Sequence, residues 1–164
     1  MKHIISAVVE NQPGVLARII GLISGRGYNI HSLNVAPTQD PAMSRITMVV
    51  PGDDRMLEQV TKQLNKLVDV IKVNDLTKEK FTNRELVLVK VMTTPKNRSD
   101  VIELTSLFHA RIIVAQNKSL TIQMAGDKDE VNNFLELVKP NGILDISRTG
   151  AIAVKKVNNG ELNG

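Results

Sequence analysis

The sequence has no cysteine among its 164 residues, so it can form neither a disulfide framework nor a thiolate metal site. It also has no long apolar run near its start. The apolar stretch that follows Met1 is interrupted at Glu10 and Asn11, which makes it too short for a signal peptide or a membrane span. We therefore expect a cytoplasmic protein that does not contact a membrane.

Aromatic residues are nearly missing, and the sequence contains only Tyr28, Phe81, Phe108 and Phe134. RNA-recognition domains stack bases on aromatic side chains of their central strands. The predicted first and third strands carry none, and Phe108 and Phe134 lie on apolar helix faces. The 21 basic and 17 acidic residues are mixed along the chain and form no basic stripe. An RNA-binding module of ferredoxin-like fold remains the alternative function, and we expect no nucleic-acid partner.

Catalytic and metal-binding constellations are missing as well. The three histidines, His3, His31 and His109, have no pair at the spacing of a zinc site. The glycines near residue 25 have the wrong spacing for a dinucleotide-binding turn. The adjacent carboxylates at 53–54 and 127–130 stand where helices are expected to begin, so capping explains them. The sequence therefore predicts a non-catalytic chain without a cofactor or metal of its own.

Hydrophobic periodicity predicts two consecutive units with the same order of elements. In the first unit, the expected elements are a strand at 3–10, a helix that Gly25–Gly27 ends, strands at 28–36 and 45–50, a helix from Asp53, and a strand at 68–76. Residues 77–84 are mostly polar and are predicted to be a linker that contains one apolar residue, Phe81. The order of this unit is βαββαβ.

The second unit repeats that order. Its expected elements are a strand at 85–93, a helix from Ser99, a hairpin of strands 111–115 and 120–125, a helix that opens with a capping box at Asp127 and Glu130, and a strand at 143–147 that 151–154 can extend. The predicted fold class is α+β, with two ferredoxin-like βαββαβ domains at 1–77 and 84–156.

This topology leaves part of each domain uncovered. A four-stranded antiparallel sheet with both helices on one face exposes its other face and its edges. Pairing with a second copy of the chain would cover such an edge. We therefore expect a homodimer.

The stretch between the first strand and the first helix is the most informative. Pro13 and Gly14 suit a first helical turn in which the N–H groups of Gly14, Val15 and Leu16 have no intrahelical partner. Such a turn can hold a carboxylate. The other interpretation is that Asn11 caps an ordinary helix.

The same stretch carries a resemblance to a known family. The run Glu10–Arg18, continued by 25–30 and 33–38, closely resembles the small regulatory subunit of acetohydroxyacid synthase, also called acetolactate synthase. The stretches 57–70 and 84–91 are similar to that family too. The resemblance implies that the first domain is an ACT domain, a module that binds small amino acids, and that the second is ACT-like.

The resemblance also implies a function and partners. In that family a separate large subunit holds thiamine diphosphate, magnesium and FAD and carries the catalytic activity. The small subunit activates it and confers feedback inhibition by branched-chain amino acids, typically valine, in valine, leucine and isoleucine biosynthesis. The expected partners are thus the large catalytic subunit, a second copy of the chain paired through the ACT domains, and valine or another branched-chain amino acid.

The family's effector site carries over onto six matching residues, which are Asn11, Gly14, Val15, Leu16, Asn29 and Ile30. In that family the site lies between two ACT domains and takes one half from each chain. The N–H groups from Gly14 to Leu16 would bind the effector carboxylate, and the two asparagines would bind its ammonium group. Leu16 and Ile30 would supply an apolar wall. This resemblance favours an effector site over a plain helix cap at Asn11.

Overall fold

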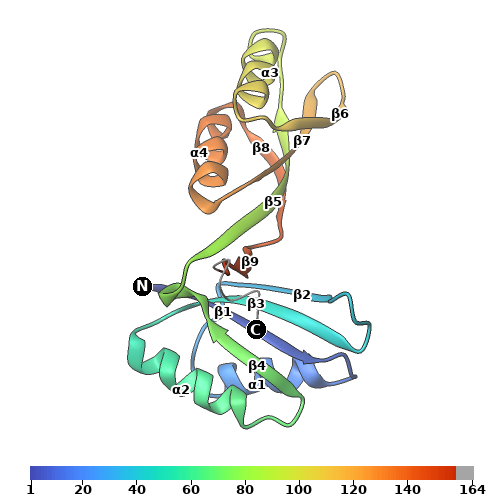
Figure 1. Ribbon diagram of the computed structural model, residues 1–164. Coiled ribbons are helices and arrows are strands. Elements are labelled where there is room, and N and C mark those ends of the chain that lie inside the picture. Colours follow the sequence, from blue (N-terminus) through green and yellow to red (C-terminus); the bar gives the residue numbers. More distant parts are fainter. Residues whose placement is uncertain (158–164) are drawn as a thin grey trace. The chain divides into compact units, whose positions relative to one another are not determined.

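The computed structural model describes residues 1–157, which form two compact units. The first unit comprises Met1–Asn83 together with the segment that begins at Ala151, and the second comprises Arg84–Gly150. Each unit is a sheet with two α-helices (Figure 1). The fold class is α+β with two βαββαβ units.

The first unit has two helices and four strands in its main sheet. Its elements are β1 (Lys2–Glu10), α1 (Val15–Ser24), β2 (Ser32–Pro37), β3 (Met43–Pro51), α2 (Asp54–Asn65), β4 (Val70–Asp75) and the 3₁₀ turn η1 (Leu76–Lys78). The strand order is β2-β3-β1-β4, and every neighbouring pair is antiparallel. Among the described residues, β2 pairs only with β3 and β4 only with β1, so both are edge strands of this sheet.

The core of the first unit lies between this sheet and its two helices. Alternate residues of β1, such as Ile5 and Ala7, face the helices and are almost fully buried. Ile19 and Ile23 of α1 and the apolar face of α2 pack against them. The alternation along β1 and the helical spacing on α1 therefore generate one shared apolar layer.

The second unit repeats this plan. Its elements are β5 (Phe81–Met92), α3 (Arg98–Leu107), β6 (Arg111–Ala115), β7 (Ser119–Gly126), α4 (Lys128–Val138), the 3₁₀ turn η2 (Lys139–Asn141) and β8 (Ile143–Arg148). The strand order is β6-β7-β5-β8. Val87 and Val89 of β5 are fully buried against α3 and α4. Phe108 and Phe134 lie in the same core with ring centroids 5.4 Å apart, which confirms that both are core residues.

Two helix starts follow the predicted capping chemistry. Asp53 precedes α2, and its carboxylate accepts a hydrogen bond from the Met56 N–H at 2.8 Å. Asp127 precedes α4 and accepts from the Glu130 N–H at 2.9 Å, while the Glu130 carboxylate accepts from the Asp127 N–H at 2.8 Å. This reciprocal pair is the predicted capping box, so these carboxylates satisfy backbone donors.

Other predicted boundaries were wrong by a few residues. Helix α1 begins at Val15, so Pro13 lies before the helix and not in its first turn. Strand β2 begins at Ser32 and not at 28, because Tyr28 and Ile30 pack against the core before the ladder starts. The predicted linker at 77–84 is shorter, because β5 already begins at Phe81.

The end of the described chain returns to the first unit. A separate strand, β9 (Ile152–Lys155), follows Gly150 and pairs with β5. Gly150 has a φ of 73°, a left-handed conformation that interrupts the extended chain after β8, so β8 and β9 are not one strand. The Lys156 N–H donates to the Lys80 carbonyl at 2.8 Å.

No helix within residues 1–157 is long and apolar enough to cross a membrane.

Candidate functional site

The turn between β1 and α1 is built around Gly14. This residue occupies the position before the helix and has a φ of 84°, in the left-handed region that L side chains rarely adopt. Its carbonyl accepts the first helical hydrogen bond, from the Arg18 N–H at 3.0 Å. No side chain caps the helix, so the interpretation of Asn11 as an ordinary cap was wrong.

Asn11 instead ties this turn to the loop between β2 and β3. Its backbone N–H donates to the Ala42 carbonyl at 2.8 Å, and its side-chain Nδ2 donates to the Pro41 carbonyl at 3.0 Å. Within the described part of the chain, the Asn11 Oδ1 atom makes no hydrogen bond. The residue is exposed, so this oxygen is free to accept from an ammonium group.

The backbone donors where the turn enters the helix are poorly paired, although the Gln12 N–H before them donates to the Glu10 carbonyl at 3.0 Å. The Val15 N–H reaches the Gln12 carbonyl at 3.4 Å, which is a long contact for a hydrogen bond. The N–H groups of Gly14 and Leu16 have no acceptor among residues 1–157. The Val15 side chain is 3% exposed and lies in the core, so this residue can offer a ligand only its backbone. Two bare donors at a helix N-terminus favour an anion.

A charged pair borders the turn. The Arg18 side chain folds back toward Gly14, where a Cβ atom added to the glycine would lie 3.3 Å from Arg18 Nη1. Arg18 Nη2 forms an ion pair with the Asp69 carboxylate. The Asp69 carbonyl also accepts from the Glu10 N–H at 2.8 Å. Neither residue was predicted from the sequence, although the spacing of four between Gly14 and Arg18 could have indicated one of them.

The remaining two candidate residues lie elsewhere. Asn29 is exposed, and Ile30 is half-buried against the core of the first unit. They follow the end of α1, whereas Gly14 precedes its start, and a helix of ten residues is about 15 Å long. The structure therefore brings Asn11 to Leu16 together and places Asn29 and Ile30 at the opposite end of α1.

The strand register also shows that the Gly14 turn lies far from Asn29 and Ile30. Ser32, just after Asn29 and Ile30, is opposite Val49, which pairs with Ile4 near the start of β1. Glu10, just before the turn, pairs with Met43 at the other end of the sheet. Six residues of strand span about 20 Å, so the two halves of the candidate site cannot enclose one small ligand within a single chain.

Comparisons with known proteins assign both parts of the chain to one family. A model of the ACT domain of acetohydroxyacid synthase small subunits matches residues 5–72, and a model of the acetolactate synthase small subunit matches residues 84–157. The chain belongs to the acetolactate synthase small-subunit family. Small subunits of this enzyme are generally regulatory and non-catalytic, and such a subunit implies a large catalytic subunit as its partner.

Individual members of the family are similar over nearly their full length. The probable acetolactate synthase small subunit of Archaeoglobus fulgidus is 47% identical over 96% of this chain and 99% of its own. The small subunit of Aquifex aeolicus is 44% identical over 94% of this chain and 81% of its own. The crystal structure of the small subunit from Thermotoga maritima has a TM-score of 0.88 at 32% identity, covering 96% of this chain and 99% of that one.

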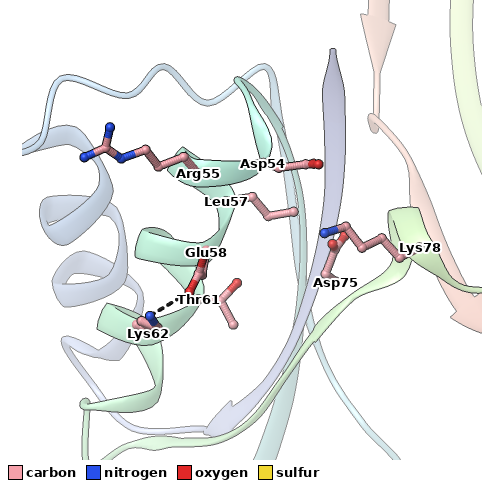
Figure 2. A pocket seen from close by; sticks show the side chains of 8 residues that line it. All are labelled: Asp54, Arg55, Leu57, Glu58, Thr61, Lys62, Asp75 and Lys78. Atoms are coloured by element: carbon pink, nitrogen blue, oxygen red, sulfur yellow. Dashed lines mark ion pairs between the residues drawn. The ribbon is translucent and has the colours of Figure 1, made fainter.

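The ACT domain of this family member also has a shallow groove beside β4 (Figure 2). It lies between α2 and the end of β4 and is lined by Asp54, Arg55, Leu57, Glu58, Thr61, Lys62, Asp75 and Lys78. Three of its charged side chains have partners, because Lys62 pairs with Glu58 at 2.7 Å and Asp75 accepts from the Thr77 N–H at 2.9 Å. Hydrogen bonding to Lys62 lowers the pKa of Glu58. The groove contains none of the six candidate residues.

The histidines of this small subunit do not converge on a site. His3 is fully buried, and its Nε2 lies 3.1 Å from the Gly52 carbonyl. His31 and His109 are exposed. No group of three or more potential metal ligands occurs within residues 1–157.

Proposed function

We propose that this small subunit activates the large catalytic subunit of acetolactate synthase and makes it sensitive to feedback inhibition by a branched-chain amino acid, with valine as the first candidate. The observation that carries the proposal is the Gly14 turn, which combines a left-handed glycine with two bare N–H groups. The cofactors of the reaction, thiamine diphosphate, magnesium and FAD, belong in this proposal to the large subunit.

The turn fits the polar end of an amino acid. The N–H groups of Gly14 and Leu16 would donate to its carboxylate, which the N-terminus of α1 also favours. The free Oδ1 atom of Asn11 and the amide of the exposed Asn29 would accept from its ammonium group. Leu16 and Ile30, both half-buried against the core, would contact its aliphatic side chain.

Two chains are needed to complete this site. The halves lie at opposite ends of α1 and of the sheet, so one half has to come from a second copy. Strand β2 is an edge strand, and antiparallel pairing of two β2 strands across a two-fold axis sets the end of one against the start of the other. That pairing would bring the Gly14 turn of one copy toward Asn29 and Ile30 of the other. We therefore propose a homodimer through the ACT domains.

A ligand bound between two copies can regulate the catalytic subunit. It stabilises the dimer arrangement that closes the site, and it shifts the population of the surfaces that the dimer presents. The catalytic subunit, which contacts those surfaces, would then respond to the effector. Reciprocally, binding of the catalytic subunit would change the valine affinity by the same factor.

The decisive experiment measures acetolactate formation by the catalytic subunit alone, with this chain, and with this chain plus valine. We expect the chain to raise the rate and valine to lower it again. No change in rate on adding the chain would overturn the activating role. Activation that valine, leucine and isoleucine all leave unaffected would overturn the feedback role alone.

Two binding measurements complement the assay. Calorimetry on the chain alone is expected to detect valine and not lysine, because the ammonium group of a lysine side chain would be buried against Leu16 and Ile30. Analytical ultracentrifugation at micromolar concentration is expected to give a dimer. A strict monomer with and without valine would contradict a site shared between two copies.

A further inference from the structure

Few contacts within the Gly14 turn fix its backbone conformation. The residue directly before the helix is glycine, which has the widest conformational freedom of all residues. No side chain caps α1. Inside the turn the Gln12 N–H donates to the Glu10 carbonyl at 3.0 Å, and the contact from Val15 N–H to the Gln12 carbonyl is 3.4 Å long. A turn of this kind would populate many conformations unless groups outside it restrain it.

One residue outside the turn contacts both of its flanks. Asp69, in the connection between α2 and β4, accepts the Glu10 N–H through its carbonyl and the Arg18 guanidinium through its carboxylate. Glu10 precedes the turn and Arg18 follows it. The Arg18 side chain also occupies the space beside Gly14, since its Nη1 lies 3.3 Å from where a Cβ of that residue would be.

We propose that Arg18 and Asp69 are positioning residues of the effector site, which hold the Gly14 turn in the conformation that presents its bare N–H groups. This inference rests on the proposed function. The two residues act on the effector through the turn and do not contact it. Because Asp69 lies in the α2–β4 connection, the site is also tied to the edge of the sheet opposite β2.

The expected effect is moderate because the pair is partly exposed. The Arg18 side chain is 52% exposed and that of Asp69 is 22% exposed. Exposed ion pairs contribute little and are screened by salt. Breaking this one should therefore weaken valine binding about threefold to fivefold.

The experiment measures the dissociation constant of L-valine by calorimetry on the full chain, at 50 mM and at 500 mM NaCl. Arg18→Met, Asp69→Ala and the double variant form a double-mutant cycle. We expect each single variant to lose about the same affinity at low salt and the double variant to lose no more than either. The charge-exchanged variant, Arg18→Asp with Asp69→Arg, should recover most of the affinity.

Lys62→Met is the matched control, because it removes another ion pair of the same domain, with Glu58, in the groove beside β4. It should leave valine binding unchanged, and activation of the catalytic subunit without valine should be normal in this control. A general loss of stability would move both readouts.

The possible outcomes distinguish a failure of the positioning role from a failure of the proposed function. Unchanged affinity in both single variants, or additive losses in the double variant, would overturn the positioning role. A loss above tenfold in Arg18→Met with none in Asp69→Ala would overturn it in favour of direct contact between Arg18 and the carboxylate. A wild-type chain that binds no branched-chain amino acid would overturn the proposed feedback role and this inference with it.

Discussion

The carboxylate of Glu85 binds the guanidinium of Arg148 through two hydrogen bonds, from Nε to Oε1 at 2.5 Å and from Nη2 to Oε2 at 3.1 Å. Glu85 is 7% exposed, and Arg148 also donates to Asn132 on α4 at 3.1 Å. The hydrogen bond with Glu85 raises the pKa of Arg148. A basic group whose pKa is raised on folding stabilises the folded state fully at every pH below its pKa in the unfolded chain. The contribution of Arg148 to the free energy of unfolding is therefore constant through the neutral pH range.

Arg148→Met should destabilise the protein, because it leaves the Glu85 carboxylate buried without its cation. Fully buried pairs lose 3–5 kcal/mol on such a change, and the partial exposure of Arg148 reduces our expectation to about 1–3 kcal/mol. Urea unfolding measures the difference. Lys62→Met, which breaks an exposed pair on α2, should leave the free energy of unfolding unchanged, and an equal loss in both variants would contradict the special role of Glu85.

Replacing two glycines in and after α1 by alanine should change the free energy of unfolding in opposite directions. Gly21 lies inside α1 with nothing within 4 Å of an added Cβ, so Gly21→Ala should stabilise the helix by about 0.5–1 kcal/mol. Gly27 follows the helix with a φ of 77°, so Gly27→Ala should cost about 1 kcal/mol. Urea unfolding of both variants tests this. A loss in Gly21→Ala would indicate that the exposed face of α1 is covered in the assembled protein.

Gly14→Asp should abolish most effector binding. The new carboxylate would lie about 4 Å from that of valine, and two like charges at that distance repel by on the order of 4 kcal/mol at an effective dielectric constant near 20. We expect the dissociation constant for valine to rise at least tenfold in calorimetry.

Gly14→Asn is the matched control for that variant. Asparagine has the same size, tolerates the left-handed conformation equally, and crowds Arg18 in the same way, but carries no charge. The difference between the two variants therefore reports the effect of the new charge, which includes its attraction to Arg18 as well as its repulsion of the effector carboxylate. Equal affinities would place the effector carboxylate elsewhere.

Asn29→Ala tests the other half of the site. Loss of the Asn29 side chain removes a hydrogen-bond acceptor from the proposed ammonium position, while the core beneath Ile30 stays intact. Feedback inhibition should weaken, with the valine concentration for half-inhibition rising about fivefold to tenfold, while activation without valine persists. The acetolactate assay with the catalytic subunit measures both, and loss of activation would point to a structural defect instead.

The fold could be predicted from the sequence because its signals are local and strong. The alternation along β1, the capping box at Asp127 and the apolar face of α2 each specify one element by short-range rules. The errors arose where tertiary contacts compete with local signals. Tyr28 has a good strand sequence around it, yet it packs against the core and its hydroxyl lies 3.4 Å from Gln59 Oε1 on α2, so β2 starts later.

The candidate site was less accessible to sequence reasoning. Periodicity identified the turn, but the left-handed conformation of Gly14 and the role of Asn11 in binding the Pro41 carbonyl depend on contacts across the sheet. Asp69 could not be found at all, because it is 51 residues from Arg18 in the sequence. That Asn29 and Ile30 join the site stays a prediction, which rests on the family resemblance.

The return of β9 to the first unit makes the second unit an insertion. The chain leaves the first unit at Asn83, within β5, and returns at Ala151, directly before β9, which pairs with β5. Lys155 of β9 also forms an ion pair with Glu79, just before β5, at 2.5 Å. Cutting the chain after residue 83 would therefore remove β9, which belongs to the first unit. Excising 84–150 and joining the cut ends with a short turn is the rational way to produce that unit alone.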